Sequence, residues 1–72
     1  MKDKVIKIIE KTLNLGEGTI TENTIINDVP EWDSLGHVLV IGALNEELEL
    51  DISIDDAMEM HSVQDILKKA GA

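Results

Sequence analysis

The sequence contains no cysteine, arginine, phenylalanine or tyrosine, and it has only one tryptophan and one proline. Without cysteine, the chain can form neither a disulfide framework nor a thiolate metal site. It also lacks any run of about 18 apolar residues, which excludes a membrane-spanning helix. Bases are scarce, since six lysines stand against fifteen acids for a net charge of −9. This balance argues against a protein that binds nucleic acids or anionic membrane surfaces, because such binding needs bases to neutralise phosphates.

The length limits what the chain can do alone. Its 72 residues are enough for one domain, 1–72, but a chain this small buries only about 60% of its unfolded surface. A deep cleft with supporting side chains has little room, so a module that serves other proteins is favoured over an autonomous enzyme. Because 43% of the residues are apolar, the chain is too hydrophobic for an acidic disordered tail. We expect a folded, monomeric, cytoplasmic protein.

The charges are unevenly distributed along the chain. All six bases lie near the two ends, and the interval 12–67 holds many acids but no base. The negative charges in this interval repel one another. They form either a solvated surface or a docking surface for basic partners. Diffuse binding of divalent cations by this surface also stays open. A calcium loop over 51–62 is excluded, because its sixth and twelfth positions are Asp56 and Ser62.

Residues 3–15 have the spacing of an amphipathic helix, with apolar side chains three to four residues apart. Asp3 is expected to cap its start and Gly16 to end it. The next segment, 16–33, is rich in Gly, Thr, Asn and Asp, and a loop of this length in a small domain is usually functional. We expect isolated isoleucines to pin it to the core, with one short helical turn near 22–26.

The segment 34–48 is the strongest helix of the sequence, and Asp33 can cap it from just outside. Two Ser-x-x-Asp spacings predict capping boxes that open two more helices, at 54–60 and 63–69. The predicted fold is therefore all-α: a small four-helix bundle with three longer helices, one short helix and a long first loop.

A helical wheel divides the segment 34–48 into two faces. The apolar arc expected to face the core contains Val38, Val40, Ile41, Leu44 and Leu48. The opposite side carries Gly36, Leu39, Ala43, Glu46 and Glu47. Small residues in this helix are expected to let another part of the molecule approach closely.

The tripeptide Asp33-Ser34-Leu35 stands where the long loop meets the strongest helix. Ser34 is expected to be the first helical residue, with its hydroxyl at an exposed helix N-terminus. Free backbone N–H groups and the helix dipole favour a phosphate ester at such a place. Taken alone, however, the tripeptide is more simply explained as an ordinary helix cap.

The run from Glu31 to Val38 strongly resembles the prosthetic-group site of acyl carrier proteins, and the resemblance extends over almost the whole chain. It implies that a phosphopantetheinyl transferase attaches a 4′-phosphopantetheine arm from coenzyme A to Ser34. The thiol of the arm would hold acyl groups as thioesters. Asp33 matches a residue that contacts the transferase and helps to position metal-bound coenzyme A. Leu35 matches an apolar residue that packs beside the arm.

The resemblance implies a carrier with no catalytic residue and no resident metal. Besides the transferase, its partners would be acyl-loading and acyl-consuming enzymes, such as a ligase, a ketosynthase or an acyltransferase, with basic docking patches. The expected docking residues on this chain are Leu39, Glu46, Glu47, Asp55 and Asp56.

Three departures point away from the carriers of primary fatty-acid synthesis, which usually have an acid at the position of Leu39. Gly36 and Asn45 also stand where such carriers often have acids. The pattern looks more like a specialised carrier in a dedicated pathway. A D-alanyl or other aminoacyl carrier stays a neighbouring alternative, and a non-carrier acidic helical adaptor is the alternative from another class.

Other readings of the site are weaker. Ser34 and His37 lie three residues apart, but no set of oxyanion donors accompanies them, so a nucleophile and base pair is not favoured. We expect His37 to be partly buried and to donate to a backbone carbonyl. Trp32 is expected to anchor the loop, and Met58 and Met60 to fill gaps at the third helix.

Overall fold

The computed structural model describes residues 2–71 of the chain. Within them the elements are α1 (Lys2–Thr12), the 3₁₀ turn η1 (Ile26–Asp28), α2 (Ser34–Glu47), α3 (Ile54–Met58) and α4 (Val63–Ala70). The strand-like pairing in this part of the chain is limited to one antiparallel bridge, between Ile25 and Ser62. The prediction of an all-α fold with four helices, one of them short, is confirmed.

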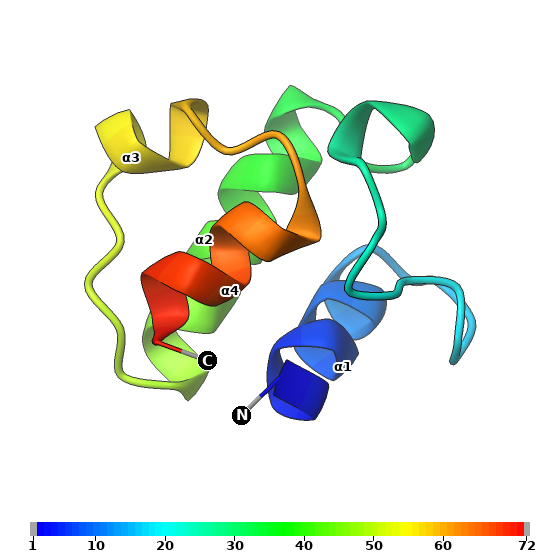
Figure 1. Ribbon diagram of the computed structural model, residues 1–72, viewed down its shortest axis with the longest axis horizontal. Helices are drawn as coiled ribbons and strands as arrows, with labels where there is room; N and C mark the ends of the chain where they lie inside the picture. The colour runs from blue at the N-terminus through cyan, green and yellow to red at the C-terminus, as the bar shows by residue number, and fades with distance from the viewer. Residues whose placement is uncertain (1, 72) are drawn as a thin grey trace.

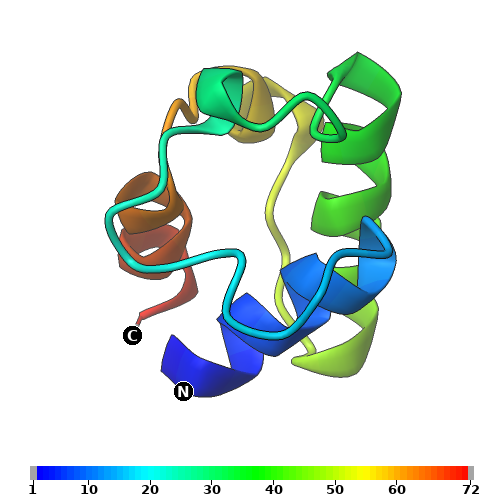
Figure 2. The same ribbon diagram turned by 90° about the vertical axis from the view of Figure 1, so that its right-hand side faces the viewer.

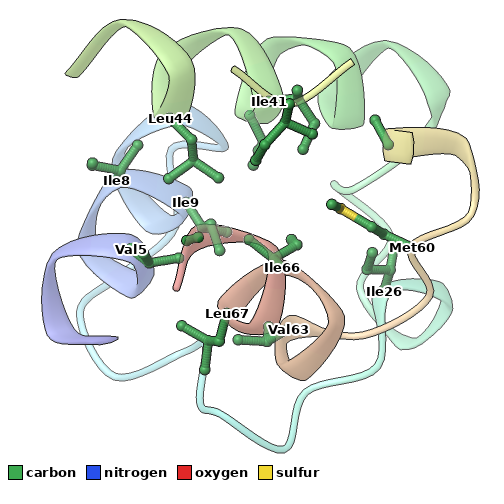
Figure 3. Close-up of a cluster of buried hydrophobic side chains, with 14 of the residues drawn as sticks. Val5, Ile8, Ile9, Ile26, Ile41, Leu44, Met60, Val63, Ile66 and Leu67 are labelled. Atoms are coloured by element: carbon green, nitrogen blue, oxygen red, sulfur yellow. The ribbon is translucent and has the colours of Figure 1, made fainter. Parts of the chain in front are cut away.

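The longest helix, α2, runs through the molecule and packs against α1 and α3, while α4 packs against α1. Figures 1 and 2 show the long loop leaving α1, passing α4 and reaching η1, which lies near the start of α2. The helices share one aliphatic core (Figure 3). None of the helices in residues 2–71 has the length and apolar character needed to cross a lipid bilayer.

The predicted caps of three helices are present. The side-chain oxygens of Asp33, Ser53 and Ser62 accept hydrogen bonds from the backbone N–H three residues later, at 2.7, 3.1 and 3.2 Å. Each bond satisfies an amide that has no partner inside its helix. At the far end of α4, Gly71 adopts the left-handed conformation with φ 77°, which a glycine tolerates without strain.

The ends of α1 differ from the prediction. The helix ends at Thr12, and Asn14 takes the left-handed conformation at φ 57°. Gly16 is not among the described glycines with positive φ, so the prediction that it ends the helix is wrong. Asparagine tolerates this conformation better than most residues and replaces glycine here. Asp3 lies inside the first turn of α1 instead of capping it.

The long loop is held to the core at several points. Ile20 and Ile26 are buried as expected, but the helical turn expected near 22–26 forms slightly later, as η1. A further tie was not predicted from the sequence. The buried carboxylate of Glu10 accepts hydrogen bonds from the N–H groups of Gly18 and Ile20, at 2.9 and 3.0 Å. One side chain of α1 therefore fixes the path of the loop.

The buried side of α2 is rotated from the predicted arc. Ile41 and Leu44 are buried as expected, but Val38 is 51% exposed. Gly36, expected on the outer side, is buried, because the segment before the helix folds over it. A Cβ atom on Gly36 would lie 2.9 Å from the carbonyl oxygen of Glu31. The predicted close approach thus occurs here.

Candidate functional site

Ser34 is the first residue of α2 and is exposed to solvent. The hydroxyls of Ser53 and Ser62 accept helix-capping bonds, whereas the Ser34 hydroxyl makes no hydrogen bond in the part of the chain that the structure describes. The capping of α2 is done by Asp33 instead. Ser34 thus differs from Ser53 and Ser62, whose hydroxyls are engaged in capping.

Asp33 shapes the turn that presents Ser34. Its Oδ1 accepts from the N–H of Gly36 at 2.7 Å, and its carbonyl oxygen accepts from the N–H of His37 at 2.8 Å. The N–H groups of Ser34 and Leu35 have no acceptor within the helix. Together with the positive end of the α2 dipole, they favour a negative charge nearby. The residues at this helix start fit a phosphodiester on Ser34.

A hydrogen-bonded chain connects this turn to α3. The indole Nε1–H of Trp32 donates to Nδ1 of His37 at 3.0 Å, and His37 Nε2 lies 2.7 Å from the carbonyl oxygen of Ala57. Because Nδ1 accepts, the assigned tautomer carries its proton on Nε2 and donates it to that carbonyl. His37 is half-buried and donates to a backbone carbonyl, as predicted. Both ring nitrogens of His37 are thus engaged by groups other than Ser34.

Large apolar side chains are exposed around this end of α2 and α3. They are Leu35 (69%), Val38 (51%), Leu39 (52%), Ile54 (55%) and Met58 (72%). The prediction that Met58 fills a gap is wrong, whereas Met60 is buried as expected. Val38 and Ile54 were not among the predicted site residues. The spacing of residues 35, 38 and 39 as i, i+3 and i+4 was the available signal, since it marks a second apolar stripe.

The predicted docking residues lie on two helices that pack together. Leu39, Glu46 and Glu47 are exposed on α2, and Asp55 is exposed on α3. Asp56 is half-buried and differs from the others, because its carboxylate forms an ion pair with Lys69 at 2.8 Å. The hydrogen bond and charge of Lys69 lower the pKa of the Asp56 carboxyl below its ordinary value.

Two ion pairs bring lysines from outside the interval 12–67 to acids inside it, so this interval does not lack positive charge in the folded protein. Lys69 reaches Asp56, and Lys2 pairs with Glu22 at 2.6 Å, so lysines from both ends of the chain fold back onto its acids. Residues 2–71 contain no group of three or more His, Cys, Asp or Glu side chains that could hold a metal ion.

Comparison with known proteins decides the family. The family described as "Phosphopantetheine attachment site" matches residues 3–69. The acyl carrier protein of Clostridium perfringens (strain SM101 / Type A) is 42% identical over 69 residues, covering 94% of this chain and 90% of the relative. This chain belongs to the acyl carrier protein family. It is a carrier that bears covalently attached 4′-phosphopantetheine.

A second relative supports this family assignment, and a solved structure shares the fold. The acyl carrier protein of Buchnera aphidicola subsp. Schizaphis graminum is 38% identical over 64 residues, covering 89% of this chain and 81% of that one. The solution NMR structure of holo acyl carrier protein from Geobacter metallireducens superposes with a TM-score of 0.84 at 21% identity. That superposition covers 97% of this acyl carrier protein and 80% of the other chain, and it shows the shared fold.

Proposed function

We propose that Ser34 is the attachment residue and that the protein shuttles acyl intermediates between separate enzymes, with no catalysis of its own. The observation that carries the proposal is the exposed Ser34 hydroxyl at the start of α2, which makes no hydrogen bond in the described residues, whereas the serines that precede α3 and α4 use their hydroxyls for capping. When bound, the arm supplies a thiol that the cysteine-free chain lacks. Membership of the family supports the carrier role.

The neighbours of Ser34 have distinct proposed roles. Asp33 fixes the first turn of α2 through its hydrogen bond to Gly36. In the proposed complex it also contacts the transferase and its metal-bound coenzyme A. In the transfer, the Ser34 oxygen forms a new ester bond to the pantetheine-bearing phosphorus of coenzyme A. The bond from that phosphorus to the bridging oxygen would break and release adenosine 3′,5′-bisphosphate, and the hydroxyl proton would pass to a base of the transferase. Leu35, which is exposed, contacts the arm or the transferase.

We also propose a dedicated set of partner enzymes with basic patches, which dock on Leu39, Glu46, Glu47 and Asp55. Two departures from the primary carriers have structural reasons. Glycine stands at position 36 because a Cβ atom there would lie too close to the Glu31 carbonyl oxygen. Asn45 exchanges two hydrogen bonds with the backbone of Ile52, at 2.9 and 3.0 Å. Leu39 has no such role and is half exposed, so it is the departure that bears on partner choice.

The test is an intact-mass measurement after incubation with coenzyme A, magnesium and a promiscuous phosphopantetheinyl transferase. We expect one phosphopantetheine increment in the native chain and in two matched controls, Ser53→Ala and Ser62→Ala. Ser34→Ala should show none. An unmodified native chain, or an increment that survives Ser34→Ala, would sink the proposal and favour a non-carrier adaptor.

A further inference from the structure

The seam between α2 and α3 opens beside Ser34, since Ser34 and His37 of α2 and Met58 of α3 border one surface groove. Deeper in the seam, Ile41 and Ala57 are buried, and Figure 3 shows Ile41 pointing from α2 into the core. An alkyl group attached to Ser34 would be drawn toward this buried surface, because apolar surface is unfavourable in water. The side chains that occupy the seam therefore decide whether such a cargo can be buried.

Two rings and one carbonyl group occupy the seam. His37 Nε2 lies 2.7 Å from the carbonyl oxygen of Ala57 on α3, and His37 Nδ1 accepts from the indole N–H of Trp32 at 3.0 Å. The Trp32 side chain is buried, so the indole fills space beneath the start of α2. We call the two side chains and the Ala57 carbonyl the strap, because they join the segment before α2, α2 itself and α3.

Opening the strap would leave polar groups without partners. An alkyl chain has no acceptor, so it cannot replace the partners of the Trp32 indole N–H and the His37 ring N–H, and such losses destabilise a folded protein. The segment before α2 also has no room to move toward the helix. It already touches Gly36, where a Cβ atom would lie 2.9 Å from the carbonyl oxygen of Glu31. The strap therefore resists the entry of an alkyl chain into the bundle.

We propose that the strap keeps the cargo outside the bundle, and that the protein therefore carries acyl groups that are small or polar instead of long alkyl chains. This inference rests on the proposed attachment at Ser34. The unfavourable free energy of an exposed alkyl chain grows with each methylene group that stays in water. A small or polar acyl group avoids most of it, so a carrier that excludes its cargo from the core suits cargo of that class.

The experiment compares two thioesters on the native chain. A promiscuous transferase loads Ser34 from acetyl-coenzyme A or from octanoyl-coenzyme A, and intact mass confirms each product. Cleavage by hydroxylamine should proceed at rates within about twofold of each other, because a buried thioester would react only in the fraction of time that it is exposed. The melting temperatures should also agree, since a chain bound in the core would stabilise the folded state alone. The methyl signals of Ile41 should be the same in both forms by NMR.

The variant His37→Ala removes the ring from the seam, and circular dichroism establishes that it is folded. Its octanoyl thioester should react at least about threefold more slowly than its acetyl thioester, with a higher melting temperature and shifted Ile41 methyl signals. The matched control is His61→Ala, since His61 is the other histidine and is exposed. It should behave like the native chain.

The outcomes separate the inference from the proposed function. A native octanoyl form with a slower reaction, a higher melting temperature and shifted Ile41 signals overturns the exclusion of cargo but leaves the attachment at Ser34 intact. A folded His37→Ala variant without these changes overturns the role of the strap. Failure to load the native chain is recognised by mass, and it overturns the attachment and this inference together.

Discussion

The two ends of the helix bundle use the same kinds of side chain for different purposes. Around α1 and α4 the aliphatic residues are sealed from water, and Val5, Ile9, Leu44, Val63 and Ile66 have no exposed surface. We call these five the sealed cluster. Near Ser34 five others stand in solvent, and we call them the open cluster: Leu35, Val38, Leu39, Ile54 and Met58.

This difference shows which apolar side chains contribute to the free energy of unfolding. Burial of apolar surface contributes roughly 25 cal/mol per Å² to folding stability. The exposed side chains of the open cluster do not make this contribution, although a small chain has little apolar surface to bury. Exposed apolar side chains gathered at one place mark an interaction surface more often than scattered ones do. Substitutions in the sealed cluster should therefore affect folding, and those in the open cluster should affect handling by partners. The following predictions test that separation.

The largest effect is expected for Ile66→Ala in the sealed cluster. Removing buried methyl and methylene groups without collapse of the cavity costs about 2–5 kcal/mol of unfolding free energy. The whole chain is expected to have roughly 4–11 kcal/mol at 0.05–0.15 kcal/mol per residue. Urea unfolding followed by circular dichroism measures the loss. Leu35→Ala in the open cluster should stay within about 0.5 kcal/mol of the native chain, and a similar loss in both variants would contradict the separation.

Two glycines of α2 should respond in opposite directions. In Gly36→Ala the added Cβ atom would lie 2.9 Å from the Glu31 carbonyl oxygen, and such overpacking costs about 1–3 kcal/mol. Gly42 has nothing within 4 Å of the corresponding position. Gly42→Ala should therefore gain up to about 1 kcal/mol of helix propensity. Thermal unfolding of the two variants measures this, and the same sign for both would refute the close approach at Gly36.

Glu10→Ala tests the tie between α1 and the long loop. It leaves the N–H groups of Gly18 and Ile20 without their carboxylate acceptor, and an unsatisfied buried donor costs about 1–3 kcal/mol. Hydrogen exchange should accelerate at the Ile20 amide more than at amides of α4. Glu10→Gln keeps one side-chain oxygen as an acceptor and should recover part of the loss. Equal effects of Glu17→Ala, an exposed loop acid, would count against the tie.

The sequence was informative where structure depends on neighbours along the chain. The capping serines Ser53 and Ser62, Asp33 and the helix that it caps could all be predicted, because caps and helical periodicity act over a few residues. The prominence of Ser34 followed from resemblance. Contacts between distant segments were missed, such as Glu10 with the loop. The buried side of α2 was misjudged at Val38 and Gly36 for the same reason, because it depends on what covers the helix.

The smallest expected effect concerns Asp65, in the first turn of α4, which contacts the segment between α3 and α4. Its Oδ2 accepts from the N–H of His61 at 2.9 Å. This bond is the main reason that the pKa of the Asp65 carboxyl is below its ordinary value, and bonds from Ser62 lower it further. The charged form is thus favoured in the folded state, so its contribution to stability is complete above the ordinary carboxyl range. That contribution is lost as the pH falls through the lower folded pKa.

The measurement is urea unfolding of the native chain and Asp65→Ala at a series of pH values from neutral to acid. The native chain should be more stable at neutral pH, and the gap between the two should narrow as the pH falls. Asp51→Ala removes one negative charge from an exposed site and controls for the general repulsion in this acidic chain. A gap that stays constant with pH would mean that the charge of the Asp65 carboxylate contributes nothing to stability. A narrowing gap would show that the Asp65 carboxylate accepts from His61 as a charged group, so that acid can release this contact.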